Sequence, residues 1–245
     1  DEEHPLVQWV MSLYSITHEQ LCVFNIGLGQ YTFKDGNIED ALFVPHEYGV
    51  KAFIRDGEKL IHEDLKGSHV TDSFFGASHT ANKSIAYVAN NPFEAIALSY
   101  DPKVDVISPL MDNGSMLGEK QSDILSDIGK YWKKVYVFKG ADYGDEEREA
   151  REYVRSYSDA LDRDTEVYWI NPIFEGLAKD SQPFEILAYL SSKDKTPKDV
   201  AEFVWNTWTK KYKFWFLSGT KTPRIEIDLE RLPRVLGTFG IVKHY

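Results

Sequence analysis

The stretch SIAYVANNPFEAIAL, residues 84–98, joins a short apolar run to a segment with helical spacing. The same order recurs in DVISPLMDNGSMLGEKQSDIL (residues 105–125) and in VYVFKGADYGDEEREA (residues 135–150), and TEVYWINP (residues 165–172) adds a fourth apolar run. Short strand-type runs that alternate with helical segments indicate βαβ units, in which crossover helices connect parallel strands. The sequence therefore predicts an α/β fold with a parallel sheet flanked by helices.

The ligand site of such a sheet is expected beyond the carboxyl ends of its strands. The predicted strands are Ile85–Ala89, Val104–Ser108, Val135–Phe138 and Val167–Ile170. Polar residues follow two of them: Asn90, Asn91 and Glu94 come after the first strand, and residues 139–145 come after the third. These two groups are the candidate site residues.

Residues 1–82 are predicted to form a small N-terminal α+β unit. Thr17 and Gln20 have the spacing of a capping box, which predicts a short helix that ends near Phe24, where the glycines of residues 26–29 follow. Residues 41–55 predict two strands joined by a turn at Glu47-Tyr48-Gly49. We expect residues 58–82 to be mostly loop.

Residues 83–174 form the predicted sheet domain, and residues 175–245 are predicted to be a mainly helical C-terminal extension. Within the extension we expect a helix from Thr196 to about Tyr212. Its buried face would carry Val200, Phe203, Val204 and Trp208. A short strand is predicted at residues 224–229.

The formal net charge of −11 excludes a protein that is basic over its whole surface, so any nucleic-acid contact must be local. The best local candidate combines lysines with tryptophans: Lys210, Lys211, Lys213, Trp208 and Trp215. Aromatic rings flanked by lysines hold single-stranded nucleic acid by base stacking. In the alternative interpretation, the tryptophans belong to the core and the lysines interact with a helix C-terminus.

Composition and the absence of known motifs exclude several further classes of protein. The single cysteine, Cys22, excludes internal disulfides and a cysteine-rich zinc site, and it predicts a reducing compartment such as the cytoplasm. No apolar run approaches the roughly 20 residues of a membrane span, so no membrane association is expected. The chain begins with Asp1, which predicts a processed or cut N-terminus. No dinucleotide-binding or Walker motif is present, and no cofactor is expected. No nucleophile elbow is present either, so no hydrolase of that type is predicted.

The order of these segments resembles the Toprim primase family, which comprises bacterial primases, phage primase–helicases and the related mitochondrial replicative helicase. In that family a strand ends in Glu-Gly-Pro-x-Asp-like residues before an Ala/Leu-rich helix, and VANNPFEAIAL (residues 88–98) occupies this place. A later strand ends in Asp-x-Asp, and VYVFKGADYGDEEREA occupies that place. The resemblance covers roughly residues 6–172 and implies a primase-like subdomain at 1–82 and a Toprim-like domain at 83–174.

The resemblance also implies a metal site, because the family holds divalent cations with that glutamate and the two aspartates. Oxygen ligands and carboxylate charge are what Mg²⁺ requires. Here the three positions carry Asn90, Lys139 and Ala141. We therefore expect no two-metal site. Three other acids lie nearby in a different spacing: Glu94, Asp142 and Asp145.

Three hypotheses follow. The first is a catalytically degenerate primase-like protein or domain of a phage or organelle DNA replication system. It would bind single-stranded DNA or a replicative helicase or polymerase, with Lys139 either contacting a phosphate or simply ending a strand. The second is an active Toprim primase or nuclease that binds Mg²⁺ through the rearranged acids. The third is a structural module of a larger assembly. The first places the protein in a phage-infected cell or an organelle matrix, and all three leave the oligomeric state open.

Overall fold

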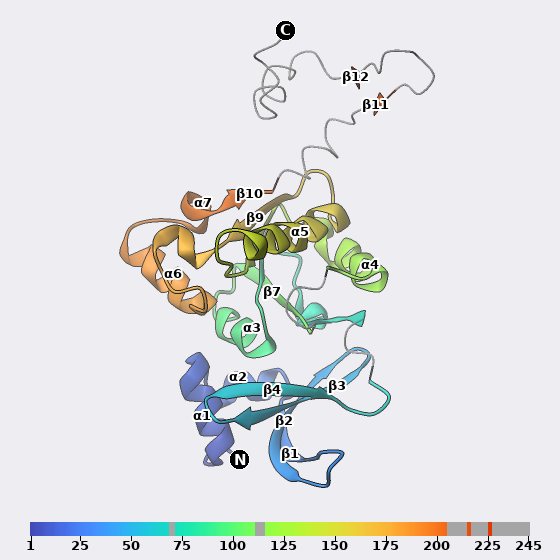
Figure 1. Ribbon diagram of the computed structural model, residues 1–245, viewed down its shortest axis with the longest axis vertical. Coiled ribbons are helices and arrows are strands. Elements are labelled where there is room, and N and C mark those ends of the chain that lie inside the picture. Colours follow the sequence, from blue (N-terminus) through green and yellow to red (C-terminus); the bar gives the residue numbers. More distant parts are fainter. Residues whose placement is uncertain (69–71, 111–115, 205–214, 217–224, 227–245) are drawn as a thin grey trace.

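The computed structural model describes residues 1–68, 72–110 and 116–204, together with the backbone of two short strands at 215–216 and 225–226. Figure 1 shows a small antiparallel sheet with two helices at the N-terminal end of the molecule and a larger sheet with helices on both faces beyond it. The described part of the chain contains no helix that is both long and apolar enough to cross a membrane.

The N-terminal unit consists of two helices and a four-stranded antiparallel sheet of order β1-β2-β3-β4. Its elements are α1 (Pro5–Tyr14), α2 (His18–Val23), β1 (Gly27–Thr32), β2 (Ile38–His46), β3 (Gly49–Asp56) and β4 (Lys59–Asp64). The predicted capping box is present, since Thr17 and Gln20 each accept a hydrogen bond from the other's backbone N–H. The predicted turn is confirmed as well, and Gly49 at its end has φ +144°.

The first helix after the capping box ends at Val23, as expected, and the glycines that follow lie in β1, where a Cβ on Gly29 would meet the ring of Phe43. One expectation for this unit was wrong. Residues 58–82 are not mostly loop, since they contain β4, β5 (Phe74–Phe75) and the 3₁₀ helix η2 (Ala77–His79). Most residues of β4 are exposed, so the strand lacks the apolar alternation that would have revealed it.

The larger sheet has six strands in the order β10-β9-β8-β6-β7-β5. Its strands beyond β5 are β6 (Ile85–Val88), β7 (Val104–Pro109), β8 (Lys134–Phe138), β9 (Glu166–Ile170) and β10 (Glu202–Phe203). The four central strands are parallel, as predicted, and the two edge strands are antiparallel to them. Because β5 precedes residue 83 and β10 follows residue 174, all three predicted segments contribute strands to this sheet.

Helices cover both faces of the six-stranded sheet (Figure 1). They are α3 (Pro92–Leu98), α4 (Glu119–Ile128), η3 (Gly129–Tyr131), α5 (Asp145–Ala160), η4 (Pro172–Glu175), α6 (Pro183–Ser192) and α7 (Pro197–Val200). Residues of α3 and α6 pack into one apolar cluster, and residues of α4 and α5 pack into another. Side chains alternate along the strands, so Tyr136 enters the first cluster and Val135 enters the second.

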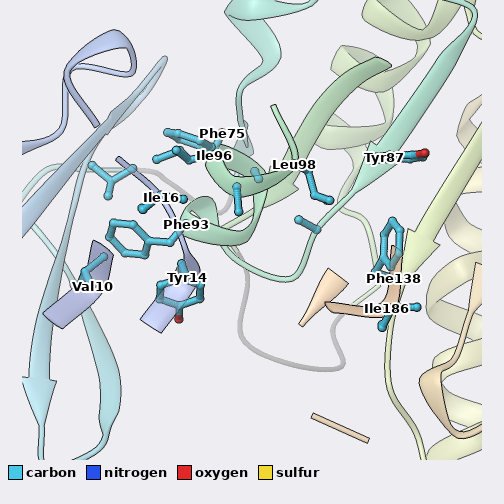
Figure 2. Packing of buried hydrophobic residues seen from close by; sticks show 14 of the residues in the cluster. Val10, Tyr14, Ile16, Phe75, Tyr87, Phe93, Ile96, Leu98, Phe138 and Ile186 are labelled. Carbon is cyan, nitrogen blue, oxygen red and sulfur yellow. The ribbon is translucent and has the colours of Figure 1, made fainter. Parts of the chain in front are cut away.

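The N-terminal unit shares its core with the sheet domain. Phe93 of α3 stacks on Tyr14 of α1 (Figure 2), with ring centroids 5.5 Å apart. Phe93 also forms a T-shaped pair with Phe53 of β3, with ring centroids 5.2 Å apart. Val10 and Ile16 lie in the same cluster as Ile96 of α3 (Figure 2). The apolar core is therefore continuous across residue 82.

The predicted helix from Thr196 to Tyr212 ends at Val200, which corrects that expectation. Glu202 and Phe203 instead extend the sheet by pairing with Trp169 and Tyr168 of β9. The ring of Phe203 packs against that of Tyr168 at 5.6 Å. Pairing with β9 satisfies backbone groups at the sheet edge, and a helical sequence pattern does not reveal that partner. The rest of the expected helix lies outside the described residues.

Asp105 lies near the amino-terminal ends of the parallel strands, and its substitution tests how much its hydrogen bonds stabilise this edge of the sheet. Its buried carboxylate accepts hydrogen bonds from Ala81 N (2.8 Å), Lys83 N (3.1 Å) and Trp132 Nε1 (2.8 Å). We predict that Asp105→Ala lowers the free energy of unfolding by about 3 kcal/mol, because one buried and two partly buried donors lose a charged acceptor. Urea denaturation measures this value.

The control for that experiment is Asp123→Ala, which removes an exposed carboxylate from α4. It should change the free energy of unfolding by no more than about 0.5 kcal/mol. Equal stability of the two variants would contradict the assignment of Asp105 as the anchor of this edge.

Candidate functional site

A cleft of about 540 Å³ opens at the carboxyl ends of β6 and β8, where the fold predicts a ligand site. Four segments line it: residues 90–94 after β6, residues 139–141 after β8, the first half of α5, and residues 179–181. The structure thus brings together Asn90, Lys139 and Ala141, the positions at which the Toprim resemblance implies metal ligands.

The first turn of α3 fixes one wall of the cleft. Asn91 is the N-cap residue, and its Oδ1 accepts hydrogen bonds from Phe93 N and Glu94 N, each at 3.0 Å. Pro92 occupies the first helical position, where its missing N–H leaves no intrahelical bond unmade. Glu94 is only 8% exposed, and its Oε2 accepts from both Asn90 N and Asn90 Nδ2 at 2.9 Å.

Glu94 and Lys139 both line the cleft, and their opposite charges attract each other. Burial raises the pKa of Glu94, while the hydrogen bonds from Asn90 and Asn91 and the charge of Lys139 lower it. Burial lowers the pKa of Lys139, while the carboxylates of Glu146 and Glu94 raise it. The Lys139 Nζ atom also lies 5.7 Å from the ring centroid of Tyr153. The ammonium group is therefore a counter-ion held inside the cleft.

Ala141 contributes no polar side chain, and its backbone is held in place from β9. Asn171, which is 2% exposed, accepts from Ala141 N at 3.3 Å and donates its Nδ2 to Ala141 O at 2.9 Å. Trp169 Nε1 donates to the carbonyl of Lys139 at 2.6 Å. The sequence analysis did not identify Asn171 as a site residue, although it ends a strand in the same way as Asn90.

Residues 179–181 form another wall of the cleft, and the backbone of Lys179 packs against Gly140. Lys179 Nζ lies 3.0 Å from Asp142 Oδ2 and 2.9 Å from Glu146 Oε2, and this pairing lowers the pKa of Glu146. A Cβ on Gly140 would overlap the carbonyl oxygen of Lys179, so only glycine fits beneath this segment. Sequence reasoning missed Lys179 because no motif surrounds it and about forty residues separate it from the third strand.

The structure does not gather the three alternative acids. Glu94 is buried in the cleft, Asp142 is exposed and paired with Lys179, and Asp145 is exposed and lies 3.2 Å from Arg148 Nη2. Across the described ranges, no three His, Cys, Asp or Glu side chains lie close enough together to hold a metal ion. An ammonium group beside one buried carboxylate, with an alanine opposite, does not fit a divalent cation.

The predicted nucleic-acid-binding cluster is not described by the structure. Trp208, Lys210, Lys211 and Lys213 lie outside the described residues, and Trp215 is placed only by the backbone of β11 (Trp215–Phe216), which pairs with β12 (Ile225–Glu226). Of the predicted nucleic-acid contacts, Lys139 alone has a described side chain.

Solved primase structures share this arrangement of the two sheets and their helices. A Pseudomonas aeruginosa DNA primase domain has a TM-score of 0.58 at 10% identity, with 86% of this chain and 77% of that chain covered. The fold is that of a primase catalytic core. The Aquifex aeolicus primase, with its zinc-binding and RNA polymerase domains, gives 0.57 at 15% identity over 85% of this chain and 59% of that one.

A third structure, the RNA polymerase domain of Mycobacterium tuberculosis primase DnaG in complex with double-stranded DNA, gives a TM-score of 0.54 at 12% identity, covering 99% of this chain and 86% of that chain. No family model and no curated protein matches the sequence. Identities of 10–15% establish the fold of this chain and leave its activity to be argued from its own residues.

The counter-ion role of Lys139 predicts a pH-dependent loss of stability in Lys139→Met, which keeps an unbranched side chain one atom shorter and removes its charge. At neutral pH the free energy of unfolding should fall by roughly 1–3 kcal/mol, because Glu94 stays buried without that positive charge. The substitution raises the pKa of Glu94 in the folded state further above its unfolded value. The deficit should therefore vanish below about pH 4, where Glu94 is protonated in both states.

Urea denaturation at both pH values measures the deficit, and Lys179→Met is the matched control. Lys179 pairs at the exposed surface, so its loss should cost less than about 1 kcal/mol. A Lys139→Met protein as stable as the wild type at neutral pH would refute the counter-ion assignment.

Proposed function

We propose that this protein is a catalytically degenerate, Toprim primase-like component of a DNA replication system of phage or organelle type. It acts by binding single-stranded DNA or a replicative helicase or polymerase, and it does not synthesise primers itself. The supporting observation is the charge arrangement in the cleft at the ends of β6 and β8. In that cleft the Lys139 ammonium group faces the buried Glu94 carboxylate.

This arrangement argues against phosphoryl transfer assisted by two metal ions. Such a mechanism needs carboxylates that hold both cations and align the attacking and leaving oxygens. Asn90 offers an amide that already donates to Glu94, and Ala141 offers no side-chain ligand. Lys139 and Lys179 already interact with carboxylates of the cleft, so a divalent cation would have to compete with two ammonium groups for them.

The same cleft is a poor place for a phosphate group. Glu94, Glu146 and Glu149 line it, and Lys139 interacts with two of these carboxylates. We therefore infer that Lys139 is a counter-ion for Glu94 and Glu146, and we place the nucleic-acid contact at the lysine and tryptophan residues of 208–215.

Nucleic acid as the partner is supported by two of the similar structures. One is a DnaG primase catalytic domain bound to single-stranded DNA, at a TM-score of 0.54 and 11% identity, and the other is the Mycobacterium tuberculosis domain with double-stranded DNA. In a chain of net charge −11, contact through one local basic segment would make binding salt-dependent while leaving most of the surface unfavourable to DNA.

Two assays on the full chain test the proposal. Primer synthesis on a single-stranded template with Mg²⁺ or Mn²⁺ should give no product, whereas fluorescence anisotropy with a labelled oligonucleotide should show binding. Replacing Lys210, Lys211 and Lys213 by Gln should weaken binding and reduce the slope of log affinity against log salt by about 2, at roughly 0.7 per phosphate contact.

The matched control replaces three exposed lysines of the N-terminal unit, Lys34, Lys59 and Lys66, by Gln and changes the net charge equally. It should leave the salt slope unchanged. Template-dependent primer synthesis would overturn the non-catalytic part of the proposal. A wild-type protein that shows no affinity for the oligonucleotide even at low salt would overturn the nucleic-acid part.

A further inference from the structure

The four-stranded and six-stranded sheets have two edges each, and three of these edges are protected against pairing with another chain. β5 and β10 contain two residues each, so they offer almost no free backbone ladder. β4 is longer and carries Lys59, Glu63 and Asp64. Short edge strands and charged side chains are common means by which proteins prevent edge-to-edge pairing. The fourth edge, β1, has neither form of protection.

β1 is the outermost strand of the N-terminal sheet and lies at the end of the molecule away from the larger sheet (Figure 1). Its six residues, GLGQYT, include no charged side chain and no proline. Backbone groups on one side of β1 pair with β2. Within the described part of the chain, the backbone groups on the other side make no hydrogen bond. β1 therefore presents a free, uncharged ladder to which an extended strand can add.

Exposed aliphatic side chains flank both ends of this ladder. Val23 ends α2 just before β1 begins, and Ile38 lies opposite Thr32 at the other end of β1. Each is 58% exposed, more than any other valine, leucine or isoleucine that the structure describes. Apolar side chains also lie on both faces of β1, since Leu28 packs against the main core and Tyr31 against the small cluster on the outer face of the sheet. A strand added here would extend both apolar faces.

The arrangement selects a second copy of this chain as the added strand. In an antiparallel pair of β1 strands, the start of one strand meets the end of the other, so Val23 of one copy and Ile38 of the second copy flank the same end of the pair. A net charge of −11 makes two copies repel each other over most of their surface, and an uncharged strand is where that repulsion is weakest. A two-fold contact of this kind closes on itself, so it produces a dimer and no filament.

We propose that the protein forms a symmetric dimer by antiparallel pairing of β1 with β1 of a second copy. Residues directly opposite each other in an antiparallel pair lie on the same face of the sheet. Leu28 and Tyr31 lie on different faces, so the two-fold axis passes through one of the two central residue positions, Gly29 or Gln30. The ladder is short, so we expect a dissociation constant in the micromolar range. The dimer does not depend on the proposed function.

Analytical ultracentrifugation of the full chain at concentrations up to roughly 100 μM tests this proposal, because it detects dissociation constants in the micromolar range. The wild type should reach twice the mass of one chain. Gln30→Glu places like charges beside the two-fold axis and should weaken the dimer roughly fivefold. Ser126→Glu adds the same charge to the exposed surface of α4 and should change the dissociation constant by no more than about twofold.

A second variant combines Val23→Ser with Ile38→Ser, which removes the exposed aliphatic groups at both ends of the ladder. Both side chains are mostly exposed, so the fold should tolerate their loss while the dimer weakens. Hydrogen exchange of the wild type supplies a readout without substitutions. Amide exchange in β1 should slow as the protein concentration rises, whereas exchange in β4 should not change.

Two results would overturn the proposal. A wild type that stays monomeric at the highest concentration rules out the second copy, and the β1 edge would then be open to an extended segment of another protein. A dimer that survives both Gln30→Glu and the double variant, with no slowing of exchange in β1, is formed by another surface of the molecule.

Discussion

The buried carboxylate of Glu94 is the constraint on which the rest of the cleft depends. Asn91 and Pro92 start α3 immediately after β6, so the first helical turn carries Glu94 below the surface. A carboxylate in that position is costly unless donors and a positive charge accompany it. Asn90 supplies two donors, and Lys139 supplies the charge from the neighbouring strand. Two of the residues that depart from the Toprim pattern, Asn90 and Lys139, therefore stabilise the Glu94 carboxylate.

Further charges extend this arrangement toward the surface. Glu146 at the start of α5 interacts with Lys139 and is also paired with Lys179, whose segment packs directly on Gly140. Two lysines and two carboxylates from four separate segments of the chain thus interact within one cleft, and Glu149 and Asp180 also line it.

The sequence predicted the parts of the fold that local patterns encode. The four parallel strands are short apolar runs, and α5 shows its buried face at Ala150, Tyr153, Val154 and Tyr157. The β4 strand was missed because Lys59, Glu63 and Asp64 give it a mostly exposed, charged sequence. The prediction of a helix beyond Val200 was wrong, because residues 202–203 form β10 by pairing with β9, which lies more than thirty residues earlier.

The sequence predicted where the candidate cleft lies, but it predicted only some of the residues that line it. Parallel strands place Asn90 and Lys139 at one edge, so their proximity follows from the fold. Tertiary packing between distant segments buries Glu94 and brings Lys179 next to Glu146. It also allows Asn171 to hydrogen-bond to the backbone of Ala141. Periodicity and motif spacing carry no signal for such contacts.

The central claim is that the chain's own ammonium group replaces a metal ion in the cleft. Isothermal titration of Mg²⁺ and Mn²⁺ into the protein tests it most directly, with Glu94→Ala and Asp142→Ala as companions. The account predicts no binding heat for the wild type or for either variant. Micromolar binding by the wild type that either substitution abolishes would contradict it and would establish a rearranged metal site.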